Sequence, residues 1–168
     1  MKLDWMGDYR CIVEKLIKYC NVYASVYNRE MDYGAEVEFS FSQIQVVEYL
    51  LENEDMHQNM SEIASRLGIT LSTFSKLVNR LVKKGFLEKF HTTDNHKAVI
   101  VRVTDFGREV YLQYSTVILK YHFSKMFQTA DEIPKEYIPK IAEMLDAGIL
   151  LPENTVCKKP PVLIPIEK

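Results

Sequence analysis

The sequence has no long apolar run, although hydrophobic residues make up 47% of the chain. No stretch approaches the roughly 20 apolar residues that a membrane-spanning helix needs. The first ten positions contain Asp4 and Asp8, and they lack the basic start and apolar core of a secretory signal. We therefore expect a protein of the cytoplasm that does not enter a membrane.

Cysteine is also scarce. The chain has 3 cysteines, at Cys11, Cys20 and Cys157, and none forms a Cys-x-x-Cys pair. An odd number without such a pair suits reduced thiols in a cytosolic protein better than a framework of disulfides. The same pattern gives no support for a zinc site built on cysteine.

Catalytic signatures are missing as well. The sequence has no His-Glu-x-x-His, no Gly-x-Ser-x-Gly and no glycine-rich phosphate loop, and its 4 histidines are scattered. Asp94 and His96 share one expected hairpin, but two ligands on one loop fall short of the four that a structural zinc takes. We expect no enzyme activity, no cofactor and no metal.

Charge is distributed unevenly along the chain. The formal net charge is only -2, yet the segment from Arg66 to Arg102 holds eight basic residues against Glu88 and Asp94. A basic segment in an otherwise acidic chain suits attraction to phosphate, which supplies most of the sequence-independent affinity for DNA. The alternative is that these charges only solvate helix faces.

A length of 168 residues fits a single domain. Near its start, apolar residues recur at alternating steps of three and four, which is helical spacing. The stripe consists of Met6, Tyr9, Val13, Leu16, Cys20, Tyr23 and Tyr27. It predicts a first helix over residues 4–31, ended by Asp32-Tyr33-Gly34, and its seven-residue period suggests pairing with other helices or a second subunit.

Three shorter helices are expected next. Ser40 and Gln43 have the spacing of a capping box at the start of one, and Asn59 and Glu62 have it at the start of another. Gly68 ends the second of these, and Thr70 or Ser72 can cap a third helix that stops at Gly85. Two short helices joined by a glycine turn form a helix-turn-helix, whose second helix enters the major groove of DNA.

The outward side of that second helix is rich in hydrogen-bonding side chains. With Phe74, Leu77, Val78 and Leu81 turned inward, the outward candidates for DNA binding are Ser72, Thr73, Ser75, Lys76, Asn79 and Arg80. Arginine and lysine pair with guanine, asparagine with adenine, and serine or threonine with bases or phosphates. No acidic residue occurs between Thr70 and Phe86, whereas a merely solvated face would more often include glutamate.

A β-hairpin is expected after Gly85. Residues 86–90 and 98–103 are β-rich runs on either side of the polar segment 91–97. Its tip, Asn95, His96 and Lys97, suits a wing that meets the DNA backbone or minor groove. An ordinary solvent-exposed hairpin is the alternative.

The order of these motifs resembles the multiple antibiotic resistance regulator (MarR) family. The residues that carry the resemblance are Phe41-Ser42-Gln43, the run SEIASRLGITLSTFSKLVNRLVKKGFLEKF, the strand Ala98-Val99-Ile100-Val101, and Thr104-Asp105-Phe106-Gly107. The resemblance implies a mainly α fold with a β-hairpin wing, in which residues 39–104 form the winged helix-turn-helix. One departure is the wing tip, where Asn95-His96-Lys97 stands in place of the family's Asp-x-Arg.

The resemblance also implies a homodimer built from helices in 4–31 and 105–148. The residues agree, because Val110, Tyr114, Val117 and Tyr121 form a stripe, with Tyr111, Ile118 and Met126 beside it. A last helix is expected over 131–148, with Pro134 or Pro139 in its first turn and Ile138, Ile141 and Leu145 facing inward. The proline-rich segment 149–168 is expected to be extended or disordered.

A two-fold dimer would bind a pseudo-palindromic operator on double-stranded DNA, and we expect it to act as a repressor. The family often binds small aromatic effectors near the junction of its helices. The tyrosines expected there are Tyr19, Tyr23, Tyr27, Tyr49, Tyr111 and Tyr114. Core packing is the alternative role for most of them.

Two other functions remain open. One branch of the family senses oxidants through a thiol on the first helix, which brings Cys11 and Cys20 into consideration, although neither falls cleanly at that branch's position. A winged helix can also bind protein, in which case the basic helix would be a solvated surface without DNA readout.

Overall fold

The computed structural model describes residues 4–56, 58–91 and 99–149. The chain divides into two compact units, one ending at Ser124 and the other beginning at Lys125. The described residues are mainly helical, with one antiparallel β-hairpin, as the sequence predicted. Among them, no helix combines the length and the apolar character that crossing a membrane requires.

The first helix is shorter than the sequence predicted. A 3-10 segment, η1 (Asp4–Tyr9), precedes α1 (Arg10–Val26), and the helix does not continue to Met31. Instead, Met31 pairs with Phe39 in a two-residue antiparallel bridge, with N···O distances of 3.1 and 3.2 Å. Gly34 (φ 85) lies in the loop that this bridge closes, where its N–H donates to Asp32 Oδ1. It therefore serves the loop and does not stop the helix.

The three predicted short helices are present. They are α2 (Phe41–Glu52), α3 (Met60–Arg66) and α4 (Leu71–Lys83), with a 3-10 turn, η2 (Glu54–Met56), after α2. The capping box of Asn59 and Glu62 is confirmed, and Thr70 caps α4 by accepting from Thr73 N at 3.1 Å.

The capping box predicted at Ser40 is wrong. The Ser40 side chain makes no bond to the helix backbone, and its hydroxyl lies 2.8 Å from the Ser42 hydroxyl. The Gln43 side chain turns away from the helix start and donates to Glu30 Oε1 at 2.6 Å. A partner far along the chain thus replaces the local one.

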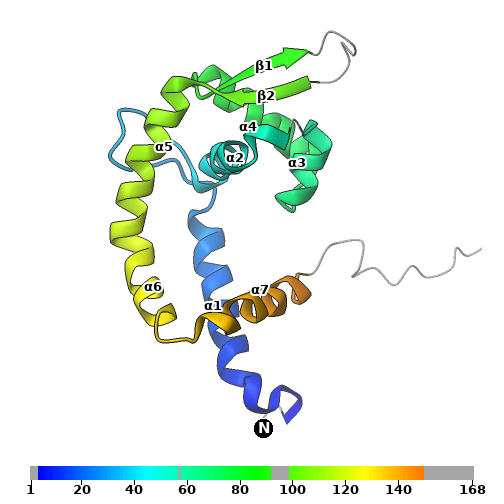
Figure 1. Cartoon of the computed structure of the whole chain (residues 1–168), viewed down its shortest axis with the longest axis vertical. Helices are drawn as coiled ribbons and strands as arrows, with labels where there is room; N and C mark the ends of the chain where they lie inside the picture. Colours follow the sequence, from blue (N-terminus) through cyan, green and yellow to red (C-terminus); the bar gives the residue numbers. More distant parts are fainter. Residues whose placement is uncertain (1–3, 57, 92–98, 150–168) are drawn as a thin grey trace, which may run out of the picture. The chain divides into compact units, whose positions relative to one another are not determined.

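The hairpin consists of β1 (Leu87–His91) and β2 (Val99–Val103), paired from Leu87↔Val103 to His91↔Val99. It begins directly after Gly85, whose φ of 79 ends α4 in the left-handed conformation. In Figure 1, the hairpin lies next to the group formed by α2, α3 and α4. Of the predicted wing segment 91–97, His91 ends β1, and the other residues, with the tip Asn95-His96-Lys97, fall outside the described residues.

The core of the first unit lies among these elements. Phe39, Phe74 and Phe86 are fully buried, and the Phe39 and Phe86 rings are 5.9 Å apart between centroids. The four residues of α4 predicted to face inward are all buried: Phe74, Leu77, Val78 and Leu81. This packing turns the opposite side of α4 to solvent.

A long helical stretch follows the hairpin. Thr104 caps α5 (Asp105–Ile118) by accepting from Gly107 N at 3.0 Å, and α5 runs into a π-helical turn, η3 (Leu119–Phe123). Val110 and Tyr114 pack in the core, whereas Tyr121, placed on the same stripe by the sequence, is 74% exposed. The outer part of the stripe is therefore uncovered in the single chain.

The remaining helices are α6 (Ser124–Ala130), the 3-10 turn η4 (Lys135–Tyr137) and α7 (Ile138–Ala147). The predicted helix from 131 therefore begins only at Ile138, and the proline in its first turn is Pro139. Within its own unit, α7 buries none of Ile138, Ile141 and Leu145, so the prediction that they face inward is not confirmed there.

Candidate nucleic-acid interface

The exposed side of α4 presents a straight line of polar and basic residues. Ser72, Lys76, Asn79 and Lys83 follow one another at steps of four, three and four, which keeps them on one face of a helix. All four are exposed, and they lie opposite the buried side. Thr73 and Arg80 are exposed beside this line, whereas Ser75 is only half-buried. We call this set of seven residues the α4 face.

Local capping sets the start of the α4 face. Thr70 accepts from the backbone of Thr73, and the two hydroxyls lie 2.9 Å apart. The remaining free N–H groups of this first turn, together with the helix dipole, favour an anion such as phosphate. With no acidic residue from Thr70 to Phe86, no carboxylate of this segment opposes that attraction.

Sequence reasoning missed two lysines of this surface. Lys83 continues the line from Ser72, and its spacing alone was a sufficient signal. Lys89 lies on β1, exposed, and its ammonium group donates to Asn79 Oδ1 at 2.5 Å. No sequence pattern indicates that contact, because it joins two elements through the fold.

Lys84 belongs to a different environment from its neighbours. Its Nζ lies 2.9 Å from Glu30 Oε1 and donates to Gln43 Oε1 at 3.2 Å and to the Glu38 carbonyl oxygen at 2.6 Å. The hydrogen bonds from Lys84 and Gln43 hold the pKa of Glu30 below its ordinary value. Lys84 is therefore committed to the fold, and its charge does not add to the α4 face.

Besides Lys89, the described part of the hairpin carries one more cation. Arg102 of β2 is exposed, and its guanidinium carbon lies 5.5 Å from the centre of the Phe90 ring. This contact holds the arginine over the hairpin. The predicted wing contacts Asn95, His96 and Lys97 are outside the described residues, so they remain predictions.

An aromatic cluster joins α1, the 31–39 loop, α2 and α5. The Tyr33 ring lies 5.3 Å from Phe41 and 5.5 Å from Tyr114 between centroids, and Tyr23 lies 5.8 Å from Phe41. Tyr33 is 8% exposed, and its hydroxyl has no hydrogen-bond partner among the described residues. Sequence reasoning placed Tyr33 in a helix-ending turn and missed its part in this cluster.

The predicted pocket tyrosines 23, 27, 111 and 114 all lie at or beside this cluster. Tyr27 donates to Gln45 Oε1 at 2.9 Å, and Gln45 Nε2 donates to the Tyr23 hydroxyl at 3.1 Å. Burial, with the neighbouring tyrosines and Glu48, raises the pKa of Tyr23 to about 12. Burial and the Glu48 carboxylate likewise raise the pKa of Tyr111 to about 12. These phenols therefore stay neutral near pH 7.

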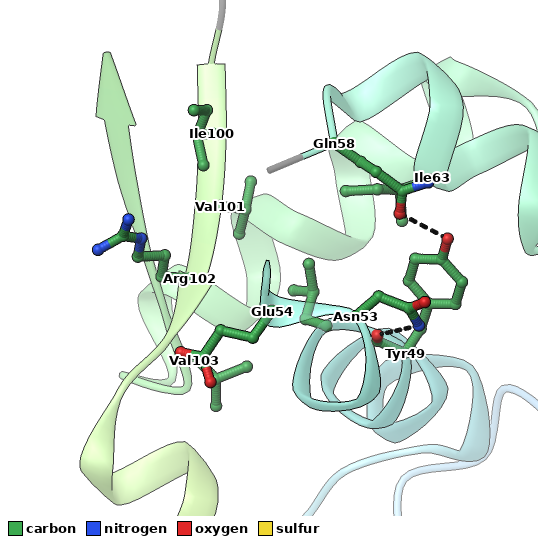
Figure 2. Close-up of a pocket in the computed structure, with 10 residues that line it drawn as sticks. Tyr49, Asn53, Glu54, Gln58, Ile63, Ile100, Val101, Arg102 and Val103 are labelled. Carbon is green, nitrogen blue, oxygen red and sulfur yellow. Dashed lines mark hydrogen bonds between the residues drawn. The ribbon is translucent and has the colours of Figure 1, made fainter. Parts of the chain in front are cut away.

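Tyr49 does not lie in the aromatic cluster. Its hydroxyl donates to Gln58 Oε1 at 2.6 Å, in a small cavity that Ile63 of α3 and Val101 of β2 also line. Figure 2 shows the Tyr49 ring directed towards Gln58. The cavity measures about 20 Å³, room for about one water molecule. The structure thus separates Tyr49 from the other predicted pocket tyrosines.

The two described cysteines lie on the surface of α1. Cys11 and Cys20 are both free and exposed on α1. Their separation of nine residues spans about 13 Å of helix, too far for a disulfide between them. Within the described ranges, no three histidine, cysteine or acidic side chains converge as metal ligands.

Comparison with known proteins finds similarity to helix-turn-helix transcriptional regulators. The sequence profile of the MarR family matches residues 38–97. The uncharacterised HTH-type transcriptional regulator YhjH of Bacillus subtilis is 27% identical over 49% of this chain and 46% of its own length. The HTH-type transcriptional repressor YetL of the same organism is 23% identical over 86% of this chain and 93% of its own. The match thus spans about half of YhjH and nearly all of YetL.

Solved structures share the fold. The transcriptional regulator PcaV from Streptomyces coelicolor, in complex with its natural ligand, superposes with a TM-score of 0.59 at 16% identity, covering 89% of this chain and 99% of its own. FabT of Streptococcus pneumoniae, in complex with DNA, gives a TM-score of 0.58 at 20% identity, covering 83% and 94%.

Proposed function

We propose that this chain is a transcriptional regulator of the MarR family that binds double-stranded DNA as a homodimer, which the family profile over residues 38–97 and the similarity to YetL support. The α4 face is the observation that carries the proposal. It combines three exposed cations, Lys76, Arg80 and Lys83, with hydrogen-bonding side chains and no carboxylate. Such a face matches the two needs of a major-groove reader, attraction to phosphate and pairing with base edges.

The α4 face is held firmly, which supports the same function. Its buried side is anchored by Phe74, Val78 and Leu81, and Lys84 fixes the last turn to Glu30 and Gln43. A reading helix must keep its register on the duplex, because base pairing depends on hydrogen-bond geometry. FabT has been crystallised with DNA, and it shares this fold.

A second copy of the chain is the proposed occupant of the uncovered apolar surface of the helices. No residue of α1 is buried, and its large exposed side chains include Ile12, Leu16, Ile17 and Val22. Leu112, Leu119 and Tyr121 of α5 and η3 are likewise at least half exposed. Such apolar patches are typical of subunit interfaces. The segments 4–31 and 105–148 then form the dimerisation region.

A two-fold dimer presents two α4 faces, so the proposed operator is pseudo-palindromic with half-sites about 10 base pairs apart. The wing, with Asn95, His96 and Lys97 at its tip, is proposed to meet the backbone or minor groove. YetL is described as a repressor, and we assign the same direction of control to this chain.

The aromatic cluster is the proposed effector site. The buried Tyr33 hydroxyl needs a partner, since an unpaired buried polar group costs about 1–3 kcal/mol. A small aromatic molecule with a polar group could stack on the rings and accept from this hydroxyl. PcaV was solved with its natural ligand, which supports ligand control within this fold. Tyr49 lies outside the cluster and has no part in this site.

The experiment is selection of bound sequences from random duplexes with the full-length protein, followed by footprinting of the enriched sequence. The proposal predicts an enriched inverted repeat, a two-fold symmetric footprint and an affinity that falls steeply as salt rises. A single asymmetric footprint, or monomers at micromolar concentration in sedimentation, would contradict the dimer. If no salt-sensitive binding to any duplex is found, a winged helix that binds protein becomes the better interpretation.

Oxidant control through Cys11 or Cys20 is tested on the same duplex. Both thiols are accessible, so mild peroxide reaches them. If peroxide leaves the affinity unchanged, thiol sensing is removed as a means of control. If the affinity changes in the wild type but not in a Cys11→Ser, Cys20→Ser variant, thiol sensing replaces effector binding in the proposal.

A further inference from the structure

Asn79 lies near the centre of the outward line of α4, between Lys76 and Lys83. Its side chain is not free in the unbound protein. Lys89, which reaches over from β1, donates from Nζ to Asn79 Oδ1 at 2.5 Å. Both residues are exposed, so the pair stands at the surface where DNA is proposed to bind.

The chemistry of the two groups fixes the orientation of the amide. An ammonium group has three donors and no acceptor, so it can face only the oxygen of an asparagine side chain. The Asn79 nitrogen, with its two N–H groups, is therefore turned to the other side. Lys89 retains further N–H groups, and the pair offers donors from both Nδ2 and Nζ.

This orientation changes which base Asn79 suits. A free asparagine pairs with adenine, because its oxygen accepts from the N6 amino group while its nitrogen donates to N7. Here a positive charge lies against that oxygen and disfavours the approach of a second donor. Guanine presents two acceptors, N7 and O6, to the major groove, which matches an edge made of donors.

We propose that Lys89 is a specificity-determining residue, which turns Asn79 from an adenine reader into part of a paired donor that selects guanine. The inference rests on the proposed function, because it applies only if the α4 face binds duplex DNA. It concerns the choice of one base pair in each half-site and not the overall strength of binding.

The test is selection of bound sequences by four full-length proteins: the wild type, Asn79→Ala, Lys89→Met and Lys89→Arg. The alanine variant identifies the base position that depends on Asn79. At that position the wild type should select guanine. Lys89→Met removes the donor at similar length, so preference should move towards adenine by roughly tenfold, within the range for one good base contact. Lys89→Arg keeps a donor and should retain guanine.

Results that contradict the role of Lys89 can be distinguished from results that contradict the proposed function. The inference is overturned if Asn79→Ala alters no base position, if the wild type already selects adenine, or if Lys89→Met weakens all duplexes equally, as loss of a phosphate contact would. In each of these cases the proposed function stands. If the wild type enriches no duplex, the proposed function is overturned and the inference falls with it.

Discussion

Lys84 Nζ lies 2.9 Å from Glu30 Oε1, so an ion pair joins the end of α4 to the chain that follows α1. Gln43, only 1% exposed, stands between them, accepting from Lys84 and donating to Glu30. Two neighbouring lysines thus have separate roles, since Lys83 faces solvent on the α4 face while Lys84 anchors the helix.

Replacing Lys84 by methionine is expected to destabilise the protein. The change leaves the buried Gln43 oxygen without its donor, which costs about 1–3 kcal/mol in free energy of unfolding. Urea unfolding measures this loss of stability. Lys83→Met is the matched control, with unfolding within about 0.5 kcal/mol of wild type but weaker binding to the enriched duplex. Equal unfolding midpoints for the two variants would contradict the anchoring role of Lys84.

Glu30 gives this network a pH dependence. Its pKa is lowered in the folded state by the hydrogen bonds from Lys84 and Gln43. A group whose folded pKa is lowered stabilises the fold above its ordinary pKa, and that stabilisation is lost as pH falls through the lower value. Glu30→Gln keeps the oxygen that accepts from Gln43 but removes the charge. Its deficit in unfolding free energy should be largest near neutral pH and shrink as pH falls below about 5, into the range where glutamate takes up a proton. A deficit independent of pH would contradict this account.

Gly107 is required by packing. It is buried in the first turn of α5, and an added Cβ would clash with the Phe86 carbonyl oxygen and come 2.9 Å from Val103 Cγ1. Gly107→Ala should therefore destabilise the fold by about 1–3 kcal/mol, as overpacking does. Gly148→Ala is the control, since its Cβ would meet only ordinary contacts at 3.4 Å or more. Thermal unfolding of both variants measures this loss of stability. A Gly107→Ala variant that melts at the wild-type temperature would contradict the clash with Phe86.

The helix-turn-helix could be predicted from the sequence because its signals are local. Asn59 and Glu62 cap α3 within one turn, Thr70 caps α4, and the left-handed Gly68 and Gly85 end both helices. The apolar spacing of Phe74, Leu77, Val78 and Leu81 then fixed which side of α4 faces solvent. Most of the α4 face follows from that one pattern.

The features that the sequence did not predict depend on contacts between segments far apart along the chain. The end of α1 was misplaced because Met31 pairs with Phe39, and the capping role of Gln43 was wrong because its side chain bonds Glu30. The Lys89 contact with Asn79 has the same origin. Local spacing cannot show which distant partner a polar side chain will meet.

The aromatic cluster yields a prediction for ligand binding. Tyr33→Phe removes the unpaired buried hydroxyl but keeps the ring, so the free protein should be as stable as wild type or slightly more so. Screening phenolic and aromatic acids by thermal shift should give ligands that stabilise the wild type more than this variant. Tyr49→Phe, which changes a tyrosine outside the cluster, should leave ligand binding unchanged. Equal binding by all three proteins would place the effector elsewhere.

The central claim is that the α4 face binds DNA, and its most direct test is the affinity of the enriched duplex measured across salt concentrations. The comparison uses the wild type, Lys76→Ala, Arg80→Ala and Lys15→Ala, the last an exposed lysine on α1 paired with Glu14. A lysine that contacts phosphate should reduce the salt slope by about 1 when removed, and an arginine that reads a base should cost about 1–3 kcal/mol. We predict such losses for Lys76→Ala and Arg80→Ala, with Lys15→Ala unchanged. Identical affinities and slopes for all four proteins would contradict the account.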